Sequence, residues 1–422
     1  MNRKPSTGNR QPETVNRKPS TVNRKPETGN RYKAIDRHAL NPPKWAEQSV
    51  QSLGAYLAEP AKNDLEKARA IFCWITHHIN YDTKGFFTGS YGSLSPDDVL
   101  KRRCAVCEGY AGLFKVLGQP AGLDVVKISG YSKGYHYSVG DSFAGPTNHA
   151  WNAVKIDGRW RLLDATWGAG YLNEKGEFVR RFQEHYFLTP PDKFIYDHFP
   201  ENPLWQILDP LISIREFESL AYLKPAFFHS GLEVGSHSES VIKADDEVVI
   251  TLRASDDALL IAQLRQEHLE LDKRFTFVQK FSGGYKIHVV FPRGGKYTLR
   301  LFAKQRHEPG DYDWSMDYLI KAGRGMQGNI GFPETYSSFD EHDVYLYGPV
   351  KSHLKPGSTQ RFKLRAPNAE EVAVIVDEKW SFLQKQGEVF EGDVDIRKGK
   401  VGVYARFAKG EQYSGLLKYM AS

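Results

Sequence analysis

The stretch HAWNAVKIDGRWRLLDATWGAG, residues 149–170, decides more about the fold of this 422-residue chain than any other segment. Its dipeptide Asp157-Gly158 is a strong signal for a two-residue turn that joins two strands into a hairpin. With that turn, Asp164 faces the residue two positions beyond His149. Because side chains alternate along a strand, His149 and Asp164 then become diagonal neighbours on one face of the hairpin.

A histidine beside an aspartate is the arrangement that activates a nucleophile in many hydrolases and acyltransferases. The carboxylate fixes the imidazole tautomer and stabilises its protonated form. We therefore expect His149 to act as a general base and Asp164 to orient it. The expectation depends on the turn, because a three-residue loop would shift the register and separate the two side chains.

The nucleophile is expected upstream, in RRCAVCEGYAGLF, residues 102–114, which holds two of the three cysteines. The spacing Cys104-x-x-Cys107 alone fits a redox pair, half of a zinc site or one nucleophile with a neighbour. Apolar residues after Cys107 follow a helical period, so this thiol lies where a helix begins and where the helix dipole favours a thiolate.

The redox and zinc readings each need a feature that the sequence does not supply. A zinc site would need two more ligands, and a thioredoxin-like pair would need a strand leading into it. Cys107 is therefore the expected nucleophile. For Cys104 we expect packing or a local role, and a disulfide that switches Cys107 off stays open.

Several neighbours are assigned by the same reasoning. We expect Trp151 and Trp167 to wall the site and Asn152 to face away from it. The sequence does not identify the donor to the oxyanion of the reaction, and the backbone N–H of Cys107 is one candidate because of its position at the helix start. Trp74 and Tyr81 are weaker candidates for this donor. Cys73 falls on the apolar stripe of a predicted helix and is expected in the core.

Outside these motifs the periodicity changes along the chain. Residues 64–79 repeat apolar positions at helical spacing, and Ser95-Pro96-Asp97-Asp98 is typical of a helix start. Beyond about residue 215, alternating runs such as EVVITLRA and KYTLRLFAK are separated by turn residues. They predict the short strands of β-sandwiches.

The expected organisation has four parts. Residues 1–31 form a heptapeptide-repeat tail, with Asn recurring at 2, 9, 16, 23 and 30. It has too few apolar residues to offset its ordering entropy and is predicted to be disordered. An α+β domain follows over 32–212, then a first β-sandwich over 213–325 and a second over 326–422.

Composition narrows the classes of function. The formal net charge of +6 is concentrated in the tail, so no basic stripe on a folded face suggests a nucleic-acid partner. No apolar run approaches the ~20 residues of a membrane span. Three cysteines and the lack of a secretory signal favour the cytoplasm. No D-x-D-x-D-G loop is present, so neither a metal nor a cofactor is expected.

Three motifs taken together, VCEGYAGLF, HAWNAVKIDGRW and LLDATWGAG, resemble those of the transglutaminase-like superfamily, and within it the kyphoscoliosis peptidase/hillarin group. Residues 372–420 resemble the β-sandwich regions of that group, and the similarity covers about 33–422. The resemblance implies an α+β papain/transglutaminase-like cysteine-triad domain followed by two all-β Ig-like sandwich domains. It places the nucleophile at Cys107, the base at His149 and the orienting acid at Asp164.

The resemblance also implies a reaction. A Cys-His-Asp triad attacks an amide of a protein or peptide and forms a thioester; water then gives a peptidase, and an amine gives a transglutaminase-like acyltransferase. The sandwich domains would dock substrates or protein partners. The alternative is a non-catalytic scaffold that keeps the fold and binds protein partners, such as cytoskeletal ones.

Overall fold

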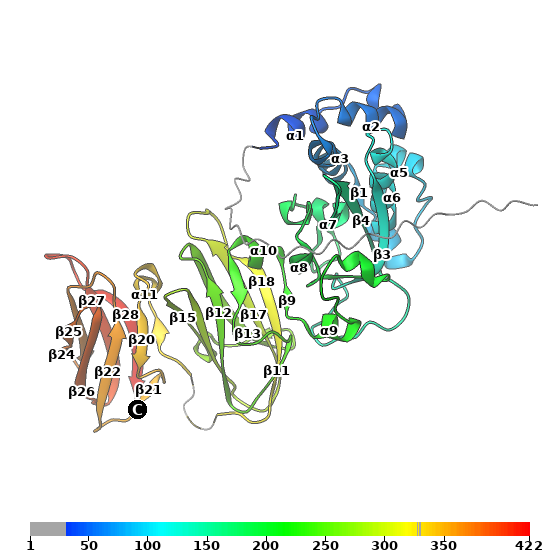
Figure 1. The fold of residues 1–422 in the computed structure, drawn as a ribbon. Helices are drawn as coiled ribbons and strands as arrows, with labels where there is room; N and C mark the ends of the chain where they lie inside the picture. Colours follow the sequence, from blue (N-terminus) through cyan, green and yellow to red (C-terminus); the bar gives the residue numbers. More distant parts are fainter. Residues whose placement is uncertain (1–30, 327, 329–330) are drawn as a thin grey trace, which may run out of the picture. The chain divides into compact units, whose positions relative to one another are not determined.

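The computed structural model describes residues 31–326, 328 and 331–422 (Figure 1). The predicted disordered tail lies outside these residues except for Arg31. The described chain forms two compact units. The first runs to Ile214, and the second comprises Arg215–Ser422 together with the short segment His136–Ser142. Within the described residues, no helix has both the length and the apolar character needed to cross a membrane.

Helices dominate the first half of the first unit. They are α1 (Lys33–Leu40), η1 (Ala46–Gln48), α2 (Val50–Ala58), α3 (Asp64–His78), α4 (Thr83–Thr88), α5 (Pro96–Arg102) and α6 (Cys107–Gly118). Helix α3 confirms the predicted helix over 64–79. The predicted start of α5 is also confirmed, because the Ser95 side chain accepts from the backbone N–H of Asp98 and Pro96 is the first helical residue.

The rest of the first unit is mainly strands and short helices. They are β1 (Asn80–Tyr81), β2 (Cys104–Ala105), β3 (Val125–Ser132), β4 (His149–Ile156), β5 (Arg159–Leu163), α7 (Ala165–Ala169), β6 (Gly170–Leu172), β7 (Phe178–Arg180), η2 (Glu184–Tyr186), α8 (Pro191–Phe194), β8 (His198–Pro200) and η3 (Pro203–Gln206). Helix α9 (Ile214–Ser219) begins at the last residue of the first unit, and its other residues belong to the second. The main sheet has four antiparallel strands in the order β5-β4-β3-β8.

The β4–β5 hairpin has the predicted register. Ile156 pairs with Arg159, so the loop is the two residues Asp157 and Gly158. Both have positive φ, 50° and 74°, as a type I′ turn requires. The twist of that turn matches the twist of the strands, which keeps the side chains of the hairpin in the predicted alternation.

The core of the first unit forms where α3 and α6 pack on the sheet. Helix α3 is buried on all sides over Ala68–Thr76, so it runs through the core instead of lying on its surface. Cys73 belongs to this core, as predicted. Helix α6 packs against β4 and β3, and its residues Tyr110, Leu113 and Phe114 are fully buried. These contacts fix the start of α6 relative to β4.

The second unit is built of sheets. Its first pair has the orders β10-β12-β16-β15 and β11-β18-β17-β13-β14, and its second pair β19-β28-β27-β23-β24 and β20-β22-β26-β25. The first set of bounds is β9 (Tyr222–Leu223), α10 (Pro225–His229), β10 (Leu232–Val234), β11 (Val241–Ala244), β12 (Glu247–Ala254), β13 (Ala258–Gln266), β14 (Leu269–Glu270), η4 (Lys273–Phe275), β15 (Thr276–Phe281), β16 (Gly284–Val290), β17 (Gly295–Gln305) and β18 (Asp313–Ala322).

The second set completes the chain. It comprises β19 (Glu334–Thr335), α11 (Ser337–Glu341), β20 (Tyr345–Gly348), β21 (His353–Leu354), β22 (Thr359–Arg365), β23 (Glu371–Val376), β24 (Lys379–Phe382), β25 (Gln384–Gln386), β26 (Val389–Asp395), β27 (Gly399–Arg406) and β28 (Ser414–Ala421). The fold class is therefore confirmed: an α+β domain is followed by all-β sheets of Ig-like type. The dividing point at 325/326 stays a prediction.

Candidate active site

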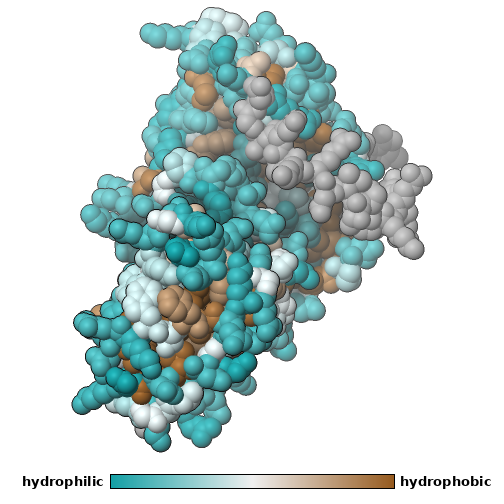
Figure 2. Space-filling view, turned by 90° about the vertical axis from the view of Figure 1, so that its left-hand side faces the viewer, coloured by the Kyte–Doolittle hydropathy of each residue, from teal (hydrophilic) through white to brown (hydrophobic). Residues whose placement is uncertain are grey.

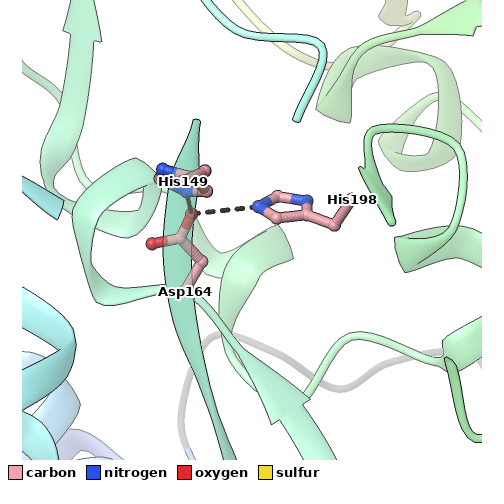
Figure 3. Close-up of side chains that lie close together, drawn as sticks. All are labelled: His149, Asp164 and His198. Carbon is pink, nitrogen blue, oxygen red and sulfur yellow. Dashed lines mark hydrogen bonds and ion pairs between the residues drawn. The ribbon is translucent and has the colours of Figure 1, made fainter. Parts of the chain in front are cut away.

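His149 and Asp164 lie together, as the hairpin register predicts (Figure 3). The Nε2 atom of His149 is 2.7 Å from the Oδ2 atom of Asp164, and both side chains are buried. His149 is the first residue of β4, and Asp164 follows the last residue of β5. The hairpin thus delivers the two residues to one end of the sheet, within hydrogen-bonding distance.

Asp164 has a second structural role, because it is the N-cap of α7. Its Oδ1 atom accepts from the backbone N–H groups of Thr166, at 2.7 Å, and Trp167, at 3.1 Å. These N–H groups have no partner within the helix, so the cap satisfies them and holds the carboxylate plane. One oxygen is thereby fixed by the helix, and Oδ2 points toward His149.

The charges of the pair reinforce each other. Burial alone would raise the pKa of Asp164, but the charge of His149 and the hydrogen bonds from His149 and His198 hold it below its ordinary value. Burial alone would lower the pKa of His149, but the charges of Asp164 and Cys107 and its bonds to both hold it above its ordinary value. An imidazolium–carboxylate pair is therefore stable at neutral pH.

Cys107 is the first residue of α6, as predicted. The N-cap residue, Val106, has no polar side chain to occupy the first turn, so the N-terminal N–H groups and the helix dipole face the thiol. Cys107 is half-buried and free. Its charge and its hydrogen bond act on His149. Since Nε2 of His149 is bonded to Asp164, the Nδ1 atom is the one left for the thiol.

A second histidine, which the motifs did not reveal, also reaches Asp164. The Nε2 atom of His198, in β8, is 3.1 Å from the same Oδ2 atom that bonds His149 (Figure 3). Its Nδ1 atom is 2.6 Å from Oδ1 of Asp197. The sequence carried one sign of it: the adjacent pair Asp197-His198 stands in an otherwise apolar run, FIYDHFP, where a buried polar pair needs partners.

Aromatic rings enclose both histidines. The ring centroid of His149 lies 6.0 Å from that of Trp151 and 5.2 Å from that of Trp167. His198 is stacked on Phe194 at 4.0 Å. The two tryptophans therefore wall the site as expected, and they exclude water from the ion pair, which strengthens it.

The alternatives for the oxyanion donor separate in the structure. The indole N–H of Trp74 donates to Oε1 of Glu47 at 3.2 Å, and the ring is fully buried, so Trp74 is wrong as a donor. Tyr81 is close enough to Cys107 for their charges to interact: burial raises the pKa of its hydroxyl, and the charge of Cys107 raises it further. Asn152 faces away from the site, as predicted, and its Nδ2 atom donates to the carbonyl of Ala111.

His149, Asp164 and His198 are also the residue types that bind metals, and their nearest ligand atoms lie within 4.8 Å of one another. Zinc bonds of about 2.0–2.1 Å in tetrahedral geometry would place neighbouring ligand atoms about 3.3 Å apart. The observed separations of 2.7 and 3.1 Å are shorter and match hydrogen bonds. The cluster therefore suits shared protons better than a zinc ion.

Cys104 stands apart from the site chemistry. It lies on the two-residue strand β2, which pairs with β1 in parallel, and its thiol is free and half-buried. Burial raises the pKa of this thiol, and the charge of Asp82 adds to the effect. A thiol with a raised pKa is a poor nucleophile at neutral pH, so Cys104 is poorly suited to that role.

Two family models match parts of this chain. Residues 51–165 match the family model of the transglutaminase-like superfamily, and residues 214–333 match the model of the KY-like, immunoglobulin-like domain. The chain therefore contains a domain of each kind, in that order, and its resemblance to the kyphoscoliosis peptidase/hillarin group is confirmed. The first match ends one residue after Asp164 and includes Cys107 and His149.

Named relatives match over a part of their own length. Kyphoscoliosis peptidase from Mus musculus is 37% identical over 279 residues, which cover 65% of this chain and 41% of the relative. Hillarin from Drosophila melanogaster is 33% identical over 305 residues, 64% of this chain and 36% of the relative. Lim and transglutaminase domain protein ltd-1 from Caenorhabditis elegans is 32% identical over 245 residues, 54% and 34% respectively. The chain thus spans about two fifths or less of the length of these relatives.

Proposed function

We propose that this chain is a cysteine-dependent enzyme that acts on amides of proteins or peptides through Cys107, His149 and Asp164. The observation that carries the proposal is the 2.7 Å bond between Nε2 of His149 and Oδ2 of Asp164. That bond leaves Nδ1 of His149 for a thiol at the start of a helix. A base, its orienting acid and an activated nucleophile are the parts that acyl transfer requires.

The reaction would proceed in two halves. The Cys107 thiolate attacks the amide carbon, and the carbonyl oxygen takes the negative charge. The C–N bond then breaks, His149 gives its Nδ1 proton to the leaving amine, and the acyl group stays on sulfur as a thioester. In the second half, His149 takes a proton from the acceptor, which attacks the thioester and releases the thiolate.

The acceptor decides the type of enzyme. Water yields a carboxylic acid and makes the protein a peptidase, as the name of the kyphoscoliosis peptidase relative suggests. A primary amine yields a new amide and makes it a transglutaminase-like acyltransferase, the activity suggested by the family name. Both share the first half-reaction, so one experiment distinguishes them.

The test is product mass. The full chain is incubated with a mixed peptide pool, with and without a primary amine such as cadaverine, and the products are weighed by mass spectrometry. If the chain is a peptidase, the products gain the mass of one water per cleaved bond in both reactions. An acyltransferase adds the amine with loss of ammonia from glutamine, a change that appears only when the amine is present.

Cys107→Ala is the matched negative variant, because it removes one sulfur atom and leaves the buried pair intact. It should give none of these products, and Cys104→Ala should behave as the native chain. Products that persist in Cys107→Ala, or a native chain that yields neither product, would refute the enzyme.

A non-catalytic scaffold is the second candidate, and one surface feature favours it. On the C-terminal sandwich, Figure 2 shows hydrophobic side chains gathered within an otherwise hydrophilic surface. Trp380 and Phe382 lie on β24, an edge strand of its sheet, and are 42% and 58% exposed. Apolar side chains on a strand at the end of a sheet suit a protein partner. Two further relatives are named cytokinesis proteins.

The product test separates the two candidates, because only the enzyme yields cleaved or amine-linked peptides.

We also propose a cytoplasmic location, because the three cysteines are free.

A further inference from the structure

We infer that His198 is a positioning residue for the triad, and that Asp197 and Tyr186 hold His198 in place. The inference rests on the proposed function and deepens it. His198 directs Nε2 at Oδ2 of Asp164, 3.1 Å away, and that oxygen is the one bonded to His149. A shift of His198 would therefore be felt by the catalytic base through one shared atom.

The carboxylate of Asp164 is fully occupied by these contacts. Oδ1 accepts from the two backbone N–H groups of α7, and Oδ2 accepts from the two histidines. An ionised carboxylate offers about four acceptor sites, so none is left over. The helix cap fixes one edge of the group, and His198 fixes the other. Without His198, Oδ2 would be held only by the base that it has to orient.

A closed loop of hydrogen bonds fixes His198 itself. Nδ1 of His198 is 2.6 Å from Oδ1 of Asp197, and Oδ2 of Asp197 accepts from the hydroxyl of Tyr186 at 3.0 Å. The carbonyl of Tyr186 accepts the backbone N–H of Asp164 at 3.0 Å. The loop thus begins at the side chain of Asp164 and returns to its backbone. A flip of the His198 ring would break the bonds at both of its nitrogens.

The sheet brings the two histidines together across a glycine. His149 in β4 pairs with Gly130 in β3, and two residues further along β3, Ser132 pairs with His198 in β8. These residues share one face because side chains alternate. Gly130 places no side chain between the rings, whose centroids are 5.3 Å apart.

A purely structural role makes a different claim. The ring of His198 packs against Phe194 and Trp167, with centroids 4.0 and 4.5 Å away. Packing depends on the ring and is indifferent to which nitrogen donates. Positioning depends on one atom, Nε2, and the two roles can therefore be separated by side chains that keep one donor each.

The experiment uses His198→Gln and His198→Asn in the full chain. The amide nitrogen of Gln reaches as far as Nε2 of histidine, and that of Asn only as far as Nδ1. Gln therefore keeps the donor to Asp164, and Asn keeps the one to Asp197. The measured quantity is the second-order rate constant for alkylation of Cys107 by iodoacetamide at neutral pH, by peptide mass spectrometry.

The expected result is a split between the two variants. His198→Gln should stay within a few-fold of the native rate. His198→Asn and the ring-preserving His198→Phe should fall by roughly 10–100-fold, the range seen when an outer hydrogen-bond partner of a site residue is lost. Equal rates in the Gln and Asn variants, or a native rate in His198→Phe, would overturn the inference.

Two controls keep the outcomes apart. His78→Gln and His78→Asn alter a histidine that stacks on Trp74 and whose Nδ1 atom is 2.9 Å from the carbonyl oxygen of Trp74, and both should keep the native rate. If Cys107 of the native chain reacts no faster than Cys104, the proposed function fails and the inference with it. If native Cys107 is fast but Gln and Asn are alike, only the role of His198 fails.

Discussion

Asp164 combines two tasks that are separable by substitution. Its Oδ1 atom caps α7, and its Oδ2 atom holds His149. The cap stabilises the helix, whereas the bond to His149 sets the tautomer and the protonation of its imidazole. Asp164 therefore links the local fold at the end of the hairpin to the protonation state of His149.

Asp164→Asn should keep the cap of α7 but lose most of the turnover. The amide oxygen can still accept at α7, but the amide nitrogen would face Nε2 of His149 and favour the wrong tautomer. A comparable change in a serine protease triad costs about 10⁴ in turnover, and we expect a loss of that order. The rate of product formation in the peptide assay measures it.

Asp164→Ala should in addition destabilise the fold by about 1 kcal/mol relative to Asn, through loss of the cap. Ser95→Ala, the cap of α5, is the matched control: it should cost a similar amount in urea unfolding and leave turnover unchanged. Native turnover in Asp164→Asn would contradict the role of Oδ2.

The pair also makes stability depend on pH in a defined direction. The pKa of His149 is raised above its ordinary 6.5, so its contribution is complete below pH 6.5 and is lost as pH rises through the folded-state pKa. The pKa of Asp164 is lowered from 3.8, so its contribution is complete above that pH and is lost as pH falls through the folded-state pKa.

The free energy of unfolding of the native chain should therefore exceed that of His149→Gln most between about pH 4 and 6.5, and by less above that window. Urea unfolding at several pH values measures the difference. A difference that instead grows as pH rises from about 4 to 6.5 and then levels off would show that His149 is neutral in the fold.

The β3–β4 strand pair is the element that makes the site possible. Gly130 lies opposite His149, and a side chain there would meet the ring of Trp151 and the carbonyl of Phe199. The hairpin register was predictable, because Asp157-Gly158 encodes its own turn geometry. The position of His198 in β8, on the other side of β3, was not predictable. The pairing of β8 with β3 joins segments about 70 residues apart in the sequence, and no local pattern encodes it.

Gly130→Ala should therefore damage both packing and function. Its Cβ atom would lie 2.3 Å from Cη2 of Trp151 and 2.4 Å from the backbone oxygen of Phe199, distances that force the strands to shift. We expect a loss of at least 1–3 kcal/mol and slower alkylation of Cys107.

Gly112→Ala, in α6, is the matched control. Nothing lies within 4 Å of a Cβ atom there, and alanine in a helix should stabilise by about 0.5–1 kcal/mol. Native stability in Gly130→Ala would show that the close approach is not required.

At the scale of the whole molecule, the order of helices and strands was easier to predict from the sequence than the pairing of strands that lie far apart in the chain. Periodicity predicted α3, α6 and the sandwich strands because each pattern is local. His198 escaped prediction because its role exists only after β8 has joined the sheet. The Cys104-x-x-Cys107 spacing was resolved by the motifs downstream, and the structure adds that the two thiols lie on different elements.

Each unit has its own core, so damage should remain local. Phe362 in β22 is fully buried in the second unit, and Phe362→Ala should cost about 3–5 kcal/mol there. Hydrogen exchange followed by mass spectrometry should accelerate in β22 and β26 and stay native in α6 and β4. The alkylation rate of Cys107 should not change. Faster exchange in α6 would contradict separate folding.

The central claim is that Cys107 is a nucleophile activated by His149, and the neighbouring Cys104 offers an internal comparison. The most direct measurement is the alkylation rate of Cys107 and of Cys104 in the same molecule at neutral pH, in the native chain and in His149→Ala. Both thiols are half-buried and free. The account predicts that native Cys107 reacts at least tenfold faster than Cys104, a ratio of about 1.4 kcal/mol, and that the advantage disappears in His149→Ala. Equal rates for the two thiols in the native chain, or an advantage that survives in His149→Ala, would contradict it.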